Sequence, residues 1–152
     1  ADKMRQTYDL STPIDPYEIC EALDITVFFA PIVDDVSGII VKKKDQSPEI
    51  AINSRHRPMR QRFTLAHELG HYVARTEVAG DADFSFSDAR GTKYDLHEFF
   101  ADEFAAALLM PTDEVTEFYK KDSSILALSN HFQVSVDAAR MRISKLKKRE
   151  LL

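Results

Sequence analysis

Two histidines flank a glutamate at helical spacing in the segment His67-Glu68-Leu69-Gly70-His71. Side chains at positions i and i+4 of a helix lie one above the other, so His67 and His71 can bind a single metal ion. Zinc at such a site acidifies a water molecule and polarises a carbonyl group. Glu68 adjoins the first histidine and is placed to act as the general base. The spacing therefore predicts metal-assisted hydrolysis.

The helix interior also contains Gly70, which weakens a helix relative to alanine. We expect this glycine to serve close packing beside the metal. The alternative, two surface histidines on an amphipathic helix, explains neither Gly70 nor the apolar residues around it.

A catalytic zinc site has three protein ligands and a water molecule. We expect Glu98 to be the third ligand, with Asp102, one helical turn later, and Glu77 as alternatives. The pattern H-E-x-x-H-x-x-G-x-x-H places its third ligand six residues after the second histidine, where Glu77 stands. It needs a glycine to turn the chain, and Ala74 occupies that position. Asp102 is instead expected to accept the other ring N–H of a ligand histidine and to fix its tautomer.

A tetrahedral oxyanion needs a hydrogen-bond donor besides the metal. Tyr72 and Tyr94 are the candidates, although their spacing places neither ring, and a core or surface role is more frequent for such residues. Cys20 is the only cysteine, so a site with several thiolates is excluded. Histidine and carboxylate ligands suit Zn²⁺, and they also accept Mn²⁺ or Fe²⁺.

The elements around these residues predict an α+β domain. A helix is expected from Pro16 to about Asp24. Strands and further helices follow, and short turns between the strands favour a small antiparallel three-stranded sheet packed on the helix that carries the histidines. These elements are expected at residues 25–30, 38–42 and 49–53 for the strands, 58–75, 95–110 and 112–121 for the helices, and 76–93 for a long loop.

The length of 152 residues suits one domain. We expect an irregular tail at 1–12, a metal-binding domain at 13–122, and C-terminal helices at 123–152 packed on the same domain. The net charge of −5 does not suit a basic nucleic-acid coat protein, and no apolar run reaches the roughly 18 residues that a membrane span needs. The polar N-terminal residues and the single cysteine favour the cytoplasm.

The C-terminal residues resemble a helix-turn-helix. From Arg140 to Leu152 there are six basic residues and one acidic residue, a local charge of +5. Arg140, Arg142 and Lys145 are therefore candidates for contact with nucleic acid or an acidic partner. The favoured interpretation is a helical hairpin that closes the domain, so DNA contact remains a less favoured alternative.

Two longer segments are similar to the ImmA/IrrE family of zinc metallopeptidases, a resemblance that covers about residues 13–145. These segments are Arg62-Phe63-Thr64-Leu65-Ala66-His67-Glu68-Leu69-Gly70-His71 and Glu98-x-x-Ala101-Asp102-x-Phe104-Ala105-Ala106-x-Leu108-Leu109-Met110-Pro111. The resemblance implies a gluzincin-like endopeptidase domain at 13–122. It also implies zinc ligands at His67, His71 and Glu98, and a catalytic base at Glu68. Asp102 departs from the asparagine that is more common in the family.

The resemblance also implies a substrate. Members of the family typically cleave a helix-turn-helix repressor, which derepresses a mobile element or a stress-response regulon. The sequence thus predicts a zinc-dependent endopeptidase with a repressor protein as its partner. The alternatives are a DNA-binding regulator and a toxin–antitoxin-like partner protein, each with a non-catalytic metal site.

Overall fold

The computed structural model describes residues 1–33, 35–79, 84–89 and 96–152. The chain forms two units. The central unit is Asp15–Ala105, and the terminal unit combines Ala1–Ile14 with Ala106–Leu152. His67, Glu68, His71 and Glu98 belong to the central unit.

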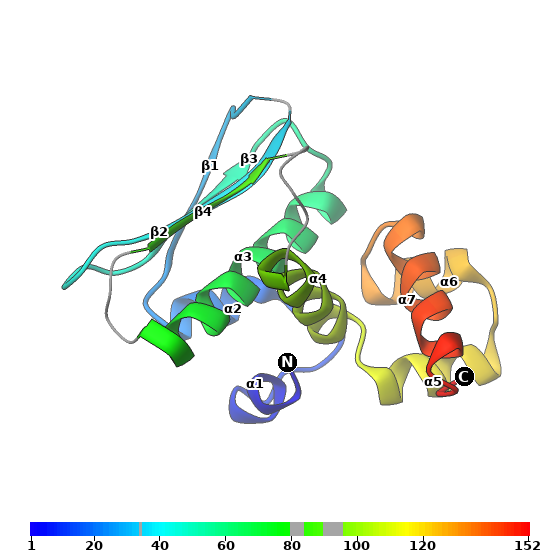
Figure 1. Ribbon diagram of the computed structural model, residues 1–152. Coiled ribbons are helices and arrows are strands. Elements are labelled where there is room, and N and C mark those ends of the chain that lie inside the picture. Colours follow the sequence, from blue (N-terminus) through cyan, green and yellow to red (C-terminus); the bar gives the residue numbers. More distant parts are fainter. Residues whose placement is uncertain (34, 80–83, 90–95) are drawn as a thin grey trace. The chain divides into compact units, whose positions relative to one another are not determined.

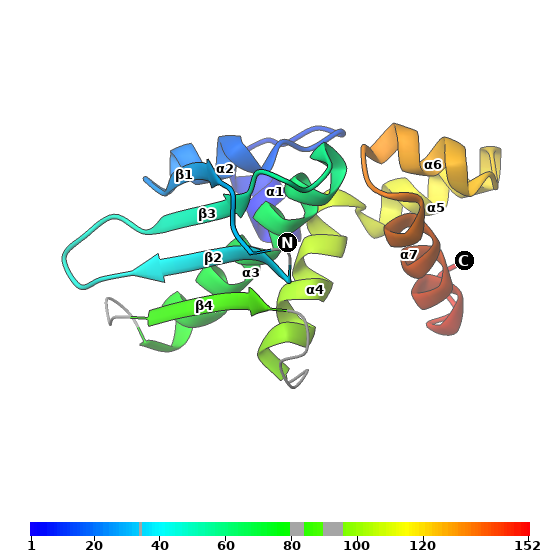
Figure 2. The same cartoon turned by 90° about the horizontal axis from the view of Figure 1, so that it is seen from above.

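Four strands of the central unit form one sheet in the order β1-β3-β2-β4 (Figure 2). The strand β1 runs parallel to β3, whereas β2 is antiparallel to both β3 and β4. The bounds of the strands are Thr26–Ala30 for β1, Val36–Lys42 for β2, Glu49–Asn53 for β3 and Phe84–Ala89 for β4. The α+β class expected from the sequence is therefore confirmed, but the sheet is mixed.

The prediction of three antiparallel strands is wrong about which strands are neighbours. Both short connections reverse the chain, as expected, so β1 and β3 point in the same direction. However, β3 rather than β2 lies beside β1, with Val27 opposite Ile50 and Phe29 opposite Ile52. Turn residues indicate that the chain reverses direction, but they do not indicate which strand the next one pairs with.

Asn53, at the end of β3, holds the connection between β1 and β2 where it passes that strand. Its side-chain amide donates hydrogen bonds to the carbonyls of Ile32, Val33 and Val36 over 3.3, 3.3 and 2.8 Å. Its side-chain oxygen Oδ1 accepts from the backbone N–H of Arg55 over 3.0 Å. The residue is fully buried. One amide thus satisfies backbone groups of an irregular segment that would otherwise lose water without gaining partners.

The second correction concerns the long loop expected at 76–93. The helix α3 spans Pro58–Ala79, and Phe84–Ala89 forms β4 against β2. The alternation of phenylalanine and serine over residues 84–87 is the period-two pattern of a strand. The acidic and glycine residues around it hid this signal.

Helices cover one face of the sheet (Figure 1). α2 spans Pro16–Ala22 and is capped by Asp15, which accepts from the backbone N–H of Tyr17. Its Cys20 is buried, and burial raises the pKa of this thiol to about 12, with the charge of Asp15 adding to the effect. The thiol is thus an inert part of the core. Fully buried apolar residues of the sheet and of α3 form this core and include Ile40, Ile50, Ile52, Leu65 and Leu69.

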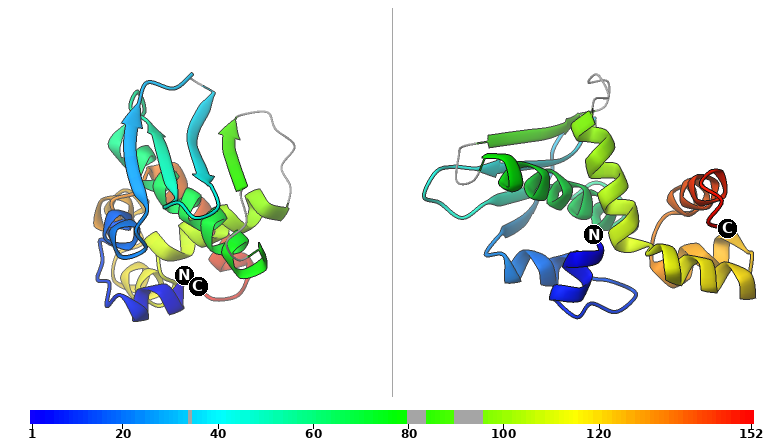
Figure 3. Two further views of the ribbon diagram at one scale, coloured as in Figure 1. Left: turned by 90° about the vertical axis from the view of Figure 1, so that its left-hand side faces the viewer. Right: turned by 60° about the horizontal axis from the view of Figure 1, so that its bottom comes forward.

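The helix α4, Leu96–Leu109, crosses α3 within the central unit (Figure 3). Its last residues belong to the terminal unit, which contains four more helices. These are α1 at Asp2–Thr7, α5 at Thr112–Lys121, α6 at Ile125–Phe132 and α7 at Val136–Lys148. Among the described residues, no helix has the length and apolar character needed to cross a membrane.

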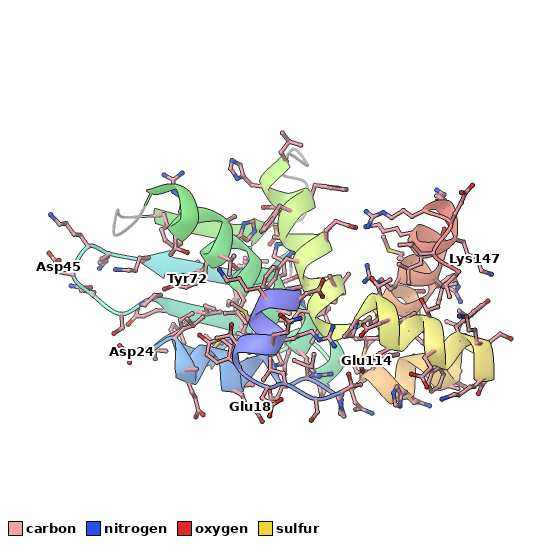
Figure 4. All side chains as sticks on the ribbon, turned by 90° about the horizontal axis from the view of Figure 1, so that it is seen from below. Glu18, Asp24, Asp45, Tyr72, Glu114 and Lys147 are labelled. Atoms are coloured by element: carbon pink, nitrogen blue, oxygen red, sulfur yellow. The ribbon has the colours of Figure 1, made fainter. Side chains whose placement is uncertain are left out.

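The helix α1 lies in the segment that was expected to be an irregular tail. Arg5 on this helix donates to Glu114 at the start of α5 over 2.7 Å, and the Thr12 hydroxyl donates to the same carboxylate (Figure 4 labels Glu114). The sequence showed no periodicity here because a helix of one and a half turns buries no residue. An ion pair at long range stabilises it instead.

Replacement of Asn53 by alanine should lower the free energy of unfolding by about 1–3 kcal/mol, because the buried carbonyl of Val36 and the part-buried carbonyls of Ile32 and Val33 lose a donor. Urea denaturation of the purified protein measures this change. Ser47→Ala is the matched control, since it removes an exposed hydrogen bond to Asp24 and should change stability by less than about 0.5 kcal/mol. Equal effects of the two substitutions would contradict the role assigned to Asn53.

Candidate metal centre

Three donor atoms from two helices converge in the central unit. His67 and His71 project from α3, and Glu98 projects from the first turn of α4. The two Nε2 atoms are 3.0 Å apart. Glu98 places Oε2 3.4 Å from the Nε2 of His67 and Oε1 3.3 Å from the Nε2 of His71. These three residues are the cluster among the described residues that could hold a metal ion.

The donor set fits a tetrahedral ion. Zinc bonds to nitrogen and oxygen of about 2.0–2.1 Å separate the ligand atoms of a tetrahedron by about 3.3 Å. The two imidazole nitrogens are 3.0 Å apart, and each lies 3.3–3.4 Å from a different oxygen of Glu98, so the contacts lie close to this value. With one ligand atom from each residue, the three atoms lie within 4.8 Å of one another. Three protein donors also leave one position of a tetrahedron for water or substrate. Solvent reaches the cluster on the α4 side, because the side chain of Glu98 is 20% exposed and that of His71 only 1%.

Asp102 lies one turn after Glu98 on α4. Its Oδ1 is 3.0 Å from Nδ1 of His67. A carboxylate accepts the proton of that nitrogen, so the neutral ring that binds a metal ion would carry its lone pair on Nε2, which faces His71 and Glu98, whereas the protonated ring donates from Nε2 to Glu98. The same contact fixes the rotation of the imidazole ring.

Electrostatics keep Glu98 in the form that a metal ligand needs. A hydrogen bond from His67 holds the pKa of the Glu98 carboxyl below its ordinary value, and the charges of His71 and His67 act in the same direction. Partial burial and the charge of Asp102 oppose this shift but do not reverse it. Glu98 is therefore anionic at neutral pH.

Gly70 allows α4 to approach α3. A Cβ atom at this position would lie 2.9 Å from Cα of Ala101 and 3.2 Å from its carbonyl oxygen. Both are backbone atoms, so α4 would have to move away. Ala101 lies one turn after Glu98, and the same displacement would carry the carboxylate away from the histidines. The close packing expected beside the metal is thus present.

Glu68 lies on the side of α3 that faces the sheet. The residue is fully buried. A Cβ atom on Gly38 of β2 would lie 2.7 Å from its Oε1 atom and 3.2 Å from its Cγ atom. The carboxylate therefore lies directly over the backbone of β2. In the sequence, Glu68 immediately follows the candidate ligand His67.

The other candidates are placed less completely. Tyr72 follows His71 on α3 (Figure 4), and its ring packs against Phe84 of β4 with centroids 6.4 Å apart. Tyr94 lies outside the described residues, so the candidate oxyanion donors stay predictions. The helix α3 continues to Ala79, which means that the chain does not turn back at Ala74. The side chain of Glu77 lies outside the described part of the structure.

The three basic candidates on α7 differ in exposure. Arg142 is buried; its Nε donates to the carbonyl of Met110 and its Nη2 to the hydroxyl of Thr112, both over 3.0 Å. This guanidinium ties α7 to the start of α5 and is not available to a phosphate. Arg140 is exposed and pairs with Asp137 over 2.9 Å. Lys145 is half-buried. These contacts favour a helical hairpin that closes the terminal unit.

Comparison with known proteins identifies the family. The sequence profile of the IrrE N-terminal-like domain, a family of peptidases, matches residues 20–144. The chain belongs to this family. The resemblance inferred from the two motifs is therefore confirmed. The matched range includes the four strands and all three residues of the cluster.

Two curated relatives share part of the sequence. The radiation response metalloprotease IrrE of Deinococcus radiodurans is 36% identical over 98 residues, which are 59% of this chain and 29% of the relative. The protein of the same name from Deinococcus deserti is also 36% identical over 98 residues, 59% of this chain and 34% of the relative. The chain thus spans about a third of the length of the curated relatives that it matches.

Sequence reasoning missed Gly38 and Thr64, which lie against each other where β2 meets α3. One signal was available, because a glycine inside a β-branched strand indicates close approach of another backbone or side chain. Nothing in the local sequence, however, told which helix approaches it. That pairing depends on contacts far apart along the chain.

Gly70→Ala should lower zinc affinity roughly tenfold or more, because α4 and Glu98 move away from the histidines. The same substitution raises intrinsic helix propensity by about 1 kcal/mol, so loss of metal cannot be ascribed to a weaker helix. Competition with a chromophoric chelator measures the affinity. Ala74→Gly, one turn later, is the control that weakens α3 without adding an atom, and its zinc affinity should match wild type. Unchanged affinity in Gly70→Ala would refute the role of this contact.

Proposed function

We propose that the chain is the catalytic part of a zinc-dependent endopeptidase that cleaves a helix-turn-helix transcriptional repressor. The observation that carries the proposal is the convergence of His67, His71 and Glu98 beside the buried Glu68. Membership of a peptidase family supports it.

His67, His71 and Glu98 would hold Zn²⁺, with Asp102 orienting the ring of His67. When bound, the ion would act as a Lewis acid toward the scissile carbonyl and would acidify a water molecule. The two imidazole nitrogens lie 3.0 Å apart and each lies 3.3–3.4 Å from an oxygen of Glu98, so the residues already face a common point. Because both rings are almost fully buried, little reorganisation is required when the substrate binds.

Glu68 acts as the proton carrier. It follows His67 directly, so its carboxylate is tethered within reach of the water that attacks the peptide carbonyl. It takes the proton from that water and passes it to the amine nitrogen as the C–N bond breaks. An oxyanion donor from the chain completes the site, and Tyr72 or Tyr94 remains our candidate for this role.

The choice of substrate rests on the resemblance to the ImmA/IrrE family. Relatives named as radiation response metalloproteases support a role in a stress response. Cleavage of a repressor releases its operator, so one catalytic event changes the expression of many genes. We therefore expect narrow specificity for one folded regulator rather than general proteolysis.

Glu68→Gln should retain zinc and lose cleavage, with a fall in kcat of about 10²- to 10⁴-fold, because the amide cannot take the proton. The assay mixes the zinc-loaded protein with a candidate helix-turn-helix repressor, chosen from the genes that neighbour its own, and identifies fragments by mass spectrometry. A chelator should protect the repressor.

Glu18→Gln is the matched control, because it makes the same chemical change at an exposed glutamate (labelled in Figure 4). It should cleave at the wild-type rate. Cleavage by Glu68→Gln at the wild-type rate would show that the assigned base is wrong. An intact repressor bound by the zinc-loaded wild type would favour partner binding without catalysis.

A further inference from the structure

The contact between Gly38 and Glu68 is one of three neighbouring contacts that join β2 to α3. Arg60, Thr64 and Glu68 are spaced four residues apart, so they share one face of α3. Arg60 donates from Nη2 to the hydroxyl of the buried Ser37 over 2.7 Å. The next residue of β2, Gly38, faces the other two: a Cβ there would lie 2.6 Å from Cγ2 of Thr64 and 2.7 Å from Oε1 of Glu68.

The space over Gly38 is therefore shared by a methyl group and a carboxylate. Thr64 is buried and Glu68 is fully buried. A glutamate side chain has three rotatable bonds, and the torsion angle of the terminal bond has a broad distribution. Here the strand backbone below, and the methyl of Thr64 one turn away, restrict where the carboxylate can lie.

We propose that Gly38 is a positioning residue that holds the Glu68 carboxylate at the place where it exchanges a proton with the attacking water. This inference rests on the proposed function of Glu68 and adds a residue to it from a different element. The missing side chain matters because a methyl group at residue 38 and the Oε1 atom cannot both occupy their sites. Displacement of a reacting group by about 1 Å can cost roughly 10²-fold in rate.

A purely structural role for Gly38 makes a different prediction. If the glycine only allows β2 to pack on α3, an added methyl group lowers stability, and any loss of kcat follows from that loss. Relief of the overlap then restores stability and kcat together. If it positions Glu68, stability and catalysis separate. Thr64→Ser tests this, since it removes Cγ2 and leaves Oε1 of Glu68 in place.

The experiment compares the zinc-loaded wild type with Gly38→Ala, Thr64→Ser, the double variant Gly38→Ala/Thr64→Ser, and Ser37→Ala. Ser37→Ala weakens the same packing of β2 on α3, because it removes the hydrogen-bond acceptor of Arg60, but it changes no atom in contact with Glu68. For each protein, zinc affinity, thermal unfolding, and kcat and KM on the repressor are measured, and crystal structures of Thr64→Ser and the double variant locate the Glu68 carboxylate.

We expect the double variant to fold and bind zinc like Thr64→Ser, with kcat lower by about tenfold or more and KM within about twofold. Ser37→Ala should lose stability but keep the wild-type kcat. Recovery of kcat together with stability in the double variant would overturn the proposal. Failure of both Gly38 variants to fold would also overturn the proposal, because the glycine would then be required only for the packing of β2 on α3.

The crystal structures separate this inference from the proposed function. If the wild type cleaves no repressor, the proposed function fails, yet the position of the carboxylate still decides the role of Gly38. The proposal requires the Glu68 carboxylate to move by about 1 Å or more in the double variant while His67 and His71 keep their places. An unmoved carboxylate would overturn it.

Discussion

The approach of α4 to α3 at Gly70 is the contact on which the metal centre depends. Two of the three donors are four residues apart on one helix, so their separation follows from helix geometry alone. The third donor comes from another helix, and its distance is set by how near the two backbones can lie. A Cβ atom at residue 70 would lie 2.9 Å from Cα of Ala101, so the glycine sets how closely the two backbones can approach at this crossing. The ion pairs of Glu98 with both imidazoles follow from that approach.

The helix α3 is fixed on a second side by the sheet. Its residues at four-residue spacing meet Ser37 and Gly38 of β2, while Gly70 meets α4 on another face. The motif residues thus occupy a helix that cannot turn about its axis without losing one contact or the other. Rigid placement of this kind suits a site whose donors must already be arranged before metal and substrate bind.

The local parts of this structure could be predicted from sequence, whereas the long-range parts could not. The spacing of His67, Glu68 and His71 carries its own geometry, and Glu98 was found because the second motif places it on a helix. The pairing of β1 with β3 was missed, since short connections indicate reversal without choosing a neighbour. Arg142 was grouped with exposed basic residues because charge pattern does not report the buried carbonyl of Met110 that it meets.

The terminal unit is built from both ends of the described chain, and this determines the order in which its parts can assemble. Arg5 and Glu114 are separated by 109 positions, whereas the central unit is one continuous segment. During synthesis α1 leaves the ribosome long before α5 is made, so at first it has no partner. All four strands of the central unit are also complete before α5 is made. Loop closure across so many residues is entropically expensive unless the intervening chain is folded. A central unit that folds first would therefore reduce the entropic cost of the contact between the early and late segments.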